Sequence, residues 1–314
     1  MHINCAAKLV KKNDICKKNL HICKKSSTFA ADKRTKMRKR FTQILVWLGI
    51  MAALTMIAMG AWVLCGGSQT TASLKWFQFV QTLATFLLPP ILCAWMWDEN
   101  HRPFSWLQLD RKTDSKLFLL AVGIMVCAIP AINLLADLNG RIRLPESLSA
   151  LEQKMRVMED AAAALTEQFL HADNIGMLLV NLGLMALLPA FAEELSFRGT
   201  LQQILGNKHV AIWVTAVIFS AIHMQFFGFV PRMLMGAMFG YIFVWTGSLW
   251  VPIVMHFTNN GLAVLAYYIF DQLGENSKNF ADTFGAGTTW WVGVWSLVIT
   301  CLGLREFYRR THKQ

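Results

Sequence analysis

Ionisable side chains interrupt three long apolar stretches of this chain, and they are the residues best suited to chemistry. Glu193 and Glu194 follow one apolar run, His223 ends a second, and His256 lies within a third. A charged side chain near the centre of a bilayer costs about 3 kcal/mol or more, so it is usually functional or paired with an opposite charge. These residues are therefore candidates for a polar site inside a membrane.

The two neighbouring glutamates differ in their expected surroundings. Glu194 and Arg198 are four residues apart and share one helix face, where their charges can neutralise each other. Glu193 points about 100° away from Glu194 and has no local partner. We therefore expect Glu193 to take part in the chemistry. The alternative is that the helices end earlier and place both glutamates at the membrane surface.

The candidate residues belong to separate helices but lie at a similar depth. A lone histidine on an apolar helix is more often a core residue, yet His256 and Asn260 share one helix face. At about 1.5 Å of rise per residue, Glu193 and His223 each lie about 20 Å from the turn near Asn207. His256 and Asn260 lie about 14 and 20 Å from the start of their own helix. This agreement in depth favours one polar site over scattered polar residues.

The composition indicates a membrane protein. Of 314 residues, 55% are hydrophobic and 16% are charged, and the mean hydropathy is +0.40. A soluble domain of this size needs more charge to cover its surface. Eight stretches approach the length of about 20 residues that crosses a bilayer: about 42–65, 76–97, 117–136, 176–204, 209–225, 229–246, 249–270 and 289–304. The sequence predicts an all-α membrane protein, a bundle of about eight transmembrane helices with an intramembrane polar site.

The positive charge of the chain is confined to its first residues. Residues 1–40 contain 13 Lys and Arg against 2 Asp and Glu, whereas residues 41–314 contain 17 of each. We expect a basic, disordered tail at 1–40 and a transmembrane domain at 41–314. Either the tail is a polybasic arm that binds anionic lipid or nucleic acid, or Met37 is the true start of the chain. Because the body is neutral, we expect no nucleic-acid partner for the protein as a whole.

The distribution of basic residues also predicts the topology. Arg102, Arg111, Lys112 and Lys116 follow the second span, and basic residues also end the chain. Basic loops favour the cytoplasm, so both termini are expected there in an integral, multi-pass protein, which would occupy the cell (inner) membrane if prokaryotic. Between the third and fourth spans, apolar residues repeat every three or four positions from Leu148 to Phe169. This pattern predicts an amphipathic helix on the membrane surface or packed on the bundle.

The polar positions form an ordered set of motifs. They read Glu-Glu-x-x-x-Arg at 193–198, Phe-x-x-x-His at 219–223 and His-x-x-x-Asn at 256–260. In order and spacing they resemble the motifs of the CPBP family, which comprises CAAX-type prenyl proteases and bacteriocin-processing or immunity proteins, also called Abi. The motifs lie within 176–270, and the eight-span plan is similar to the CAAX protease Rce-type fold. No motif position departs from the family pattern, whereas the basic segment 1–36 has no expected counterpart.

The resemblance implies hydrolysis of a peptide bond inside the membrane by an endopeptidase. Glu193 would be the general base that activates water, with His223 holding or polarising that water. His256 and Asn260 would stabilise the oxyanion that forms on the scissile carbonyl. The other two motif residues would fix the helix and the charge balance of the site: Glu194 and Arg198.

The sequence leaves open whether the site binds a metal. The family is commonly called metalloprotease, and two histidines with one glutamate can form a zinc site with an open position. The candidate ligands are Glu193, His223 and His256. The chain has no His-Glu-x-x-His sequence, and a glutamate that binds zinc is less available as a base. We favour water activated by Glu193, with zinc as the one cofactor left open.

The expected partners are membrane lipid and a membrane-bound peptide or protein substrate. The type substrate in eukaryotes is a prenylated C-terminal peptide, whereas a prokaryotic relative can instead cut a leader peptide or a membrane-bound signal peptide. Two other functions would use intramembrane Glu and His. One is a proton-coupled transporter, although the chain lacks the paired halves of many transporters. The other is a non-catalytic immunity or scaffold protein, against which the intact motifs argue.

Overall fold

The structure is a computed structural model that describes residues 3–206, 208–273 and 284–313, with side chains from residue 34 onward. Within these ranges the chain is almost entirely helical and has no β-strand. Seven of the described helices are long and apolar enough to cross a membrane: Arg34–Leu64, Thr71–Trp97, Ser115–Gly140, Ile175–Leu205, Phe226–Thr246, Trp250–Leu273 and Gly287–Thr311. An eighth apolar helix, α10 (Lys208–Ala221), is shorter. The predicted all-α membrane bundle of about eight helices is confirmed.

The basic segment is helical in the structure. The chain divides into two compact units, Met1–Val46 and Trp47–Gln314, and helix α1 (Ile3–Leu64) contributes to both. Where the sequence suggests a disordered tail at 1–40, α1 instead begins at Ile3. Neither proline nor glycine occurs before Gly49, so the local sequence contains no residue that interrupts a helix. The start at Met37 and the division at residue 40 stay predictions.

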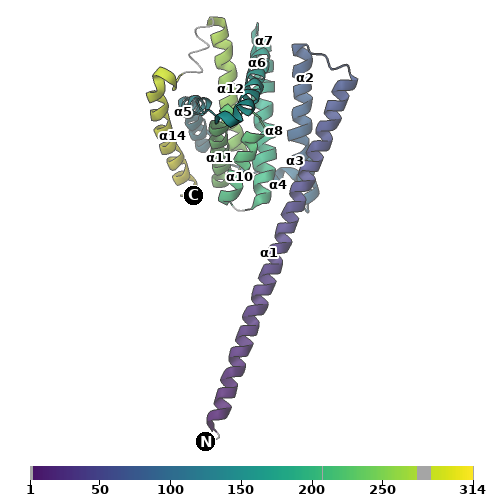
Figure 1. Cartoon of the computed structure of the whole chain (residues 1–314), viewed down its shortest axis with the longest axis vertical. Helices are drawn as coiled ribbons and strands as arrows, with labels where there is room; N and C mark the ends of the chain where they lie inside the picture. Colours follow the sequence, from purple (N-terminus) through teal and green to yellow (C-terminus); the bar gives the residue numbers. More distant parts are fainter. Residues whose placement is uncertain (1–2, 207, 274–283, 314) are drawn as a thin grey trace. The chain divides into compact units, whose positions relative to one another are not determined.

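The helix that carries the two glutamates is built from consecutive segments (Figure 1): α7 (Ile175–Asn181), the π-helical η3 (Leu182–Leu187), α8 (Leu188–Ser196), the π-helical η4 (Phe197–Gln202) and α9 (Gln203–Leu205). Its first turn is capped by Asn174, whose Oδ1 accepts a hydrogen bond from the Met177 N–H at 3.0 Å. Gly206 ends it with a left-handed backbone, φ 75°. π-helical turns recur at functional sites, and here two of them flank the glutamates.

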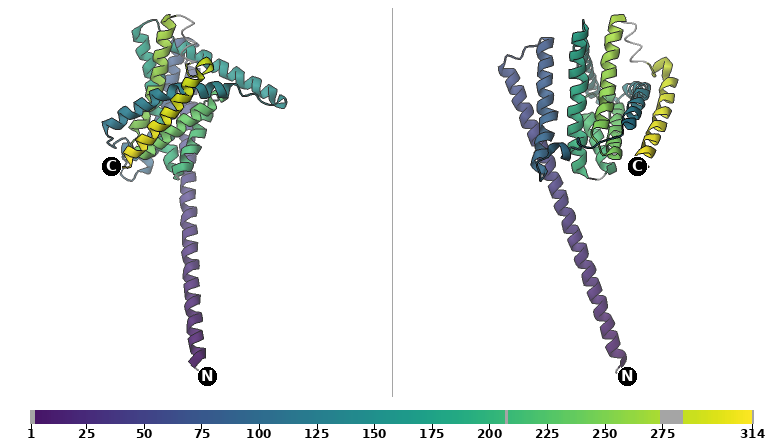
Figure 2. Two further views of the ribbon diagram at one scale, coloured as in Figure 1. Left: turned by 90° about the vertical axis from the view of Figure 1, so that its left-hand side faces the viewer. Right: turned by 180° about the vertical axis from the view of Figure 1, so that it is seen from behind.

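Apart from α1 and α10, the remaining described elements follow in chain order. They are α2 (Thr71–Thr82), η1 (Leu83–Leu87), α3 (Leu88–Trp97), α4 (Pro103–Trp106), α5 (Ser115–Gly140), η2 (Glu146–Leu148), α6 (Ser149–Leu170), η5 (Phe226–Gly228), α11 (Phe229–Thr246), α12 (Trp250–Leu273), η6 (Gly287–Thr289) and α14 (Trp290–Thr311). Helix α12 packs against α8 and α5, α10 packs against α11, and α14 packs against α5. Figures 1 and 2 show α8, α11 and α12 side by side. Buried apolar side chains of α5, α11 and α12, including Met125, Phe239 and Met255, form a core cluster.

Two polar side chains of η4 reach backbone carbonyls of α11. Arg198 Nη2 donates to Gly236 O at 2.9 Å, and Gln202 Nε2 donates to Gly240 O at 3.1 Å. A Cβ on Gly236 would lie 3.3 Å from the guanidinium, and one on Gly240 would lie 2.7 Å from Gln202 Oε1. Glycines spaced in this way are typical of close helix contacts in membranes. The two glycines therefore let η4 and α11 approach closely enough for both bonds.

Gly240→Ala is expected to destabilise the protein by about 1–3 kcal/mol, because the new methyl group overpacks this contact. Gly123→Ala on α5 is the matched control, since a Cβ there meets nothing within 4 Å. The control should be neutral or stabilising, because alanine favours a helix by about 1 kcal/mol over glycine. Thermal unfolding of both variants in detergent makes the comparison. Equal stability would show that the close approach of the helices is not required.

Helix α6 forms the predicted amphipathic element, and it runs obliquely to the long helices (Figure 2, left). Glu152 ties its first turns to the preceding loop. Its carboxylate accepts hydrogen bonds from the Leu144 N–H at 2.7 Å, from Arg143 at 3.0 Å and from Arg156 at 2.8 Å. These three donors, the backbone N–H first, lower the pKa of Glu152 from 4.5 to about 2.

This lowered pKa predicts how the contact between α6 and its preceding loop responds to acid. A carboxylate with a depressed pKa stabilises the folded form above its ordinary value of 4.5, and the stabilisation is lost as the pH falls through about 2. Protection of the Leu144 amide from hydrogen exchange, relative to its intrinsic rate, should therefore persist to a pH of about 3 and disappear near 2. Glu152→Gln should weaken the protection at every pH above about 3, and the difference from the wild-type protein should vanish near pH 2. If the Leu144 amide lost its protection near pH 4.5, the ordinary pKa of a glutamate, the lowered pKa of Glu152 would be contradicted.

Candidate intramembrane active site

Glu194 is a fully buried charged group of the site, as is its partner Arg198. Its side chain has 0% exposure, and Oε1 accepts hydrogen bonds from Arg198 Nη1 at 2.6 Å and from His256 Nδ1 at 2.9 Å. The contact with Arg198 is the i, i+4 pair that the sequence predicts. The contact with His256 joins α8 to α12. A buried carboxylate is tolerated only when such partners offset its desolvation.

Arg198 contacts polar groups through its two terminal nitrogens and aromatic rings through its guanidinium, whereas its Nε has no hydrogen-bond partner among the described residues. Its two terminal nitrogens bind Glu194 and the Gly236 carbonyl. Its guanidinium carbon lies 4.7 Å from the centre of the Phe219 ring and 5.4 Å from that of Phe239. Cation–π contacts of this kind gain strength where water is excluded. Arg198 therefore connects the first motif to the second motif and to α11.

His256 lies between the two glutamates. Because a carboxylate can only accept a hydrogen bond, Nδ1 carries a proton and donates a hydrogen bond to Glu194 Oε1. On the other side of the ring, Nε2 lies 3.9 Å from Glu193 Oε2. The ring is stacked on Phe239, with 5.4 Å between the ring centres. This contact makes His256 a neighbour of Glu193, in addition to the role on the water that the resemblance implies for His223.

His223 contributes a free ring nitrogen to the same region. Its Nδ1 donates to the Phe219 carbonyl at 2.8 Å, so the neutral ring has an unprotonated Nε2 that can accept a hydrogen bond. The Phe219 ring meets His223 and His256 edge-on, at 5.2 and 6.1 Å between ring centres. Phe219 thus contacts both histidines.

Asn260 lies one helical turn beyond His256 on α12. Asn259 Nδ2 donates to Asn260 Oδ1 at 3.1 Å, which fixes the orientation of the second amide and leaves its Nδ2 as a donor. Among the described residues, Asn260 has no hydrogen bond to either glutamate or to His256. The structure therefore brings Glu193, Glu194, Arg198 and His256 into direct contact, whereas the motif residues His223 and Asn260 stand around them.

The three candidate zinc ligands do not form a metal-binding group. In the part of the chain that the structure describes, no group of three or more His, Cys, Asp or Glu side chains could hold a metal ion. Glu193 and His256 are neighbours, but His223 does not join them in such a group. The described arrangement does not fit the zinc site left open by the sequence.

Sequence reasoning misses three contributors to the site. Gly236 could have been found from the sequence, since it and Gly240 form a Gly-x-x-x-Gly pair in an apolar run. Phe239 has none, because nothing distinguishes it from other core aromatic residues. Arg232 meets the same criterion as Glu193, a charge inside an apolar run. Its Nη2 donates to Gln225 Oε1 at 2.8 Å, and its charge interacts with Glu193.

A bundle of membrane-length helices around a buried Glu–Arg–His cluster defines an integral, multi-pass membrane protein with a polar site between its spans. Residues 175–262 match the family described as type II CAAX prenyl endopeptidase Rce1-like. This segment contains all three motifs, so the predicted resemblance to the CPBP family is confirmed, and this part of the chain is similar to the Rce1-like family.

One curated relative has the same kind of domain. The uncharacterized protein YpbD of Bacillus subtilis (strain 168) is 36% identical over 77 residues, which cover 23% of this chain and 38% of the relative. The match therefore spans well under two thirds of the relative's length. No solved structure matches the chain.

Proposed function

We propose that the protein is an intramembrane endopeptidase of the CAAX-protease type, which hydrolyses a peptide bond of a membrane-associated protein or peptide. The observation that best supports this is the asymmetry between the two glutamates. The Glu194 side chain has 0% exposure, whereas that of Glu193 keeps 14% and lies beside His256. One carboxylate is fixed in an ion pair, and its neighbour stays accessible to water and substrate.

In the proposed reaction, a water molecule donates its hydrogens to the Glu193 carboxylate and to His223 Nε2. His223 can accept because its Nδ1–H is already used by the Phe219 carbonyl. As the water oxygen bonds to the scissile carbonyl carbon, Glu193 takes a proton. Glu193 then transfers that proton to the departing nitrogen, and the carbon–nitrogen bond breaks to leave a carboxylic acid and an amine; the acid then gives its proton to the amine or to water.

The oxyanion formed in this step needs hydrogen-bond donors. Asn260 supplies Nδ2, whose direction is set by the bond from Asn259. His256 supplies Nε2–H in its doubly protonated form, in which it and Arg198 balance the charges of the two glutamates. Such balance matters because uncompensated charge within the spans is costly.

Two rival functions would use the same geometry. A scaffold or immunity protein would keep the fold without turnover, and a proton-coupled transporter would use the carboxylates as relays. Mass spectrometry of membrane peptides from cells with wild-type protein or with Glu193→Gln separates these functions. A peptidase creates new peptide termini that depend on Glu193, whereas a scaffold or a transporter creates none.

The substrate class follows from the position of the site. Glu193 lies within a membrane-length helix, so we propose that the substrate reaches it from the bilayer. A prenylated C-terminal peptide fits the description of the matching family, and a leader or membrane-bound signal peptide fits the same geometry. A cell-membrane location with both termini in the cytoplasm stays a prediction.

Metal removal should leave the proposed activity unchanged. Because Glu193, His223 and His256 do not form a metal-binding group, purified protein should retain its Glu193-dependent cleavage after treatment with a strong chelator. Elemental analysis should find no stoichiometric zinc. One zinc per chain that is lost in both His223→Ala and His256→Ala would overturn this prediction and make the protein a metalloprotease.

A further inference from the structure

The turn between His223 and α11 is held by three other helices. It contains η5, and its backbone binds Asn139 of α5, Glu159 of α6 and Ser220 of α10. The bonds run from Asn139 Nδ2 to Phe226 O at 2.9 Å, from the Phe227 N–H to Glu159 Oε2 at 3.3 Å, from Ser220 Oγ to Phe229 O at 2.7 Å and from the Val230 N–H to Asn139 Oδ1 at 3.3 Å. A turn that is fixed from three sides is a rigid support for the side chains around it.

Arg232 is the charged side chain that this turn positions. Its Nη1 donates to Gln225 O at 3.3 Å, and its Nη2 donates to Gln225 Oε1 at 2.8 Å. A Cβ on Gly228 would lie 3.1 Å from Nη2, so the glycine leaves room for the guanidinium. The residues before and within η5 therefore fix the place of the Arg232 head group.

Arg232 lies close enough to the proposed active site for its charge to act on Glu193 and His223. An arginine has five N–H donors, and the bonds to Gln225 use only two of them. Among the described residues, no partner binds the other donors, and no carboxylate lies within ion-pair distance of the guanidinium. The protein therefore leaves part of this group available to a ligand.

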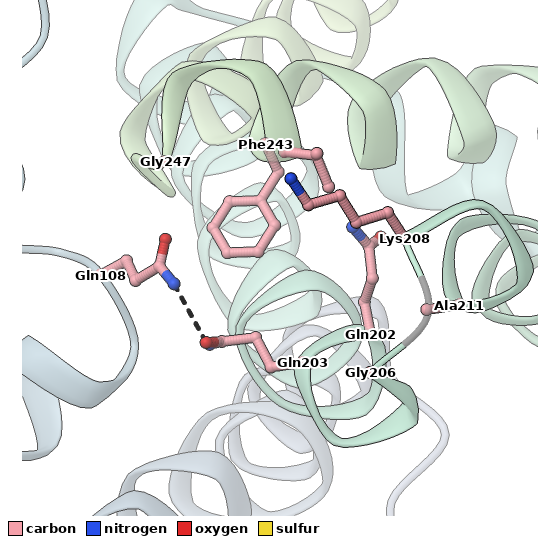
Figure 3. A pocket seen from close by; sticks show the side chains of 9 residues that line it. Gln108, Gln202, Gln203, Gly206, Lys208, Ala211, Phe243 and Gly247 are labelled. Atoms are coloured by element: carbon pink, nitrogen blue, oxygen red, sulfur yellow. Dashed lines mark hydrogen bonds between the residues drawn. The ribbon is translucent and has the colours of Figure 1, made fainter.

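Figure 3 shows how two polar side chains are paired elsewhere in the bundle. In a cavity of about 220 Å³ beside Gly206 and Gly247, Gln108 Nε2 donates to Gln203 Oε1 at 3.1 Å. Both side chains are neutral, and one supplies the donor that the other accepts. Arg232 differs because it carries a charge and the protein uses only part of its donors.

The charges of the proposed site leave Arg232 without a close counter-charge. In the proposed reaction, Arg198 and doubly protonated His256 balance the two glutamates. Glu159 also acts on Arg232, but its Oε2 accepts the Phe227 N–H. An unpaired charge within the spans is costly, and a guanidinium can bind a carboxylate through two parallel hydrogen bonds. A carboxylate brought by the substrate would therefore be a favourable partner.

We propose that Arg232 is a specificity-determining residue, which binds a carboxylate of the substrate close to the scissile bond. This inference rests on the proposed peptidase function, because Arg232 acts on the same site. The carboxylate can come from the end of the substrate chain or from an Asp or Glu side chain. Both sources offer the same chemistry to the guanidinium, and the test separates them.

The test uses peptides that span one bond cut by the protein, identified from the Glu193-dependent peptide termini of membranes. Each peptide is synthesised with its carboxylates intact, with an amide at its C-terminus, or with Asn and Gln in place of Asp and Glu. Wild-type protein should show a KM about tenfold or more higher for one of the two neutral forms than for the intact peptide. The neutral form that binds weakly identifies the source of the carboxylate.

Arg232→Gln should raise the KM of the intact peptide about tenfold or more, and it should leave the KM of the weakly binding neutral form unchanged. The reason is that the neutral form already lacks the bond that the variant removes. Arg141→Gln is the matched control, since it removes an exposed arginine that is already paired with Asp137 at 2.7 Å. This control should hydrolyse all three peptides as the wild-type protein does.

Two results would overturn the inference and leave the proposed function standing. The first is equal hydrolysis of the three peptides by wild-type protein, a comparison that requires no folded variant. The second is an effect of Arg232→Gln that is absent, or equal for the intact and neutral peptides, which would make Arg232 a structural residue of the turn. Membranes without any Glu193-dependent terminus would instead refute the peptidase function, and the inference with it.

Discussion

Glu193→Gln is expected to lower peptide-bond hydrolysis by a factor on the order of 10² or more, because the amide keeps the shape of the side chain but cannot accept a proton from water. Folding and membrane insertion should persist, since a neutral amide is less costly to bury than a carboxylate. The structure supports this separation of effects. Glu194, not Glu193, makes the short contacts to Arg198 and His256, so the substitution leaves that ion pair intact.

The measurement compares peptide termini in membranes that contain wild-type protein, Glu193→Gln or Glu146→Gln. Glu146 is an exposed residue of η2, and its substitution controls for the change of charge alone. Termini found with wild-type protein and with Glu146→Gln, but absent with Glu193→Gln, would be its products. Near-normal turnover by Glu193→Gln at equal protein level would refute the mechanism and favour the scaffold function.

Arg198→Ala is expected to destabilise the protein by about 3–5 kcal/mol, because it leaves Glu194 as a buried charge without its strongest partner. It also removes the hydrogen bond to the Gly236 carbonyl and the contact with Phe219. Adding Glu194→Gln should recover much of the loss, since the stranded charge is then gone. The part not recovered should reflect the bond to α11 and the aromatic contact.

Arg310→Ala is the matched control for that prediction. Glu306 and Arg310 have the same spacing as Glu194 and Arg198, with 3.0 Å between Nε and Oε1, but their side chains are 37% and 51% exposed. Exposed pairs contribute about 0–1 kcal/mol, so unfolding by denaturant should barely change. If the double variant were no more stable than Arg198→Ala alone, the buried residues would not be paired in the membrane protein.

The sequence predicts much of the site because helix periodicity determines which side chains are neighbours. Glu194 and Arg198 form the expected pair, and the depth argument correctly brings His256 to the glutamates. The same periodicity places Glu193 on a different face from Glu194. It cannot tell which partner meets that face, because this depends on how α8 and α12 are rotated about their axes. The contact between Glu193 and His256 is therefore one that the sequence does not predict.

The remaining features depend on contacts between distant segments. The π-helical turns η3 and η4 shift the helix register locally, and no apolar pattern marks them. Gln202 looks like an ordinary polar residue near a helix end, yet its bond to Gly240 makes it part of the contact with α11. Charge alone suggests disorder at 1–40, while the same segment lacks residues that interrupt a helix, and α1 begins at Ile3. The expected tail stays a prediction.

The shortness of α10 has a consequence for the supply of water. Its 14 residues cover about 21 Å, less than the roughly 30 Å of a bilayer's apolar core. The chain therefore leaves the helix before His223, while still within the depth of the bilayer. Irregular backbone at that depth is tolerated only beside protein or a wet cavity, and Asn139 binds the Phe226 carbonyl and the Val230 N–H at 2.9 and 3.3 Å. We expect water to enter the bundle along this stretch. Water is the second substrate of a hydrolase, and it would then reach the site next to His223 although the protein is surrounded by lipid.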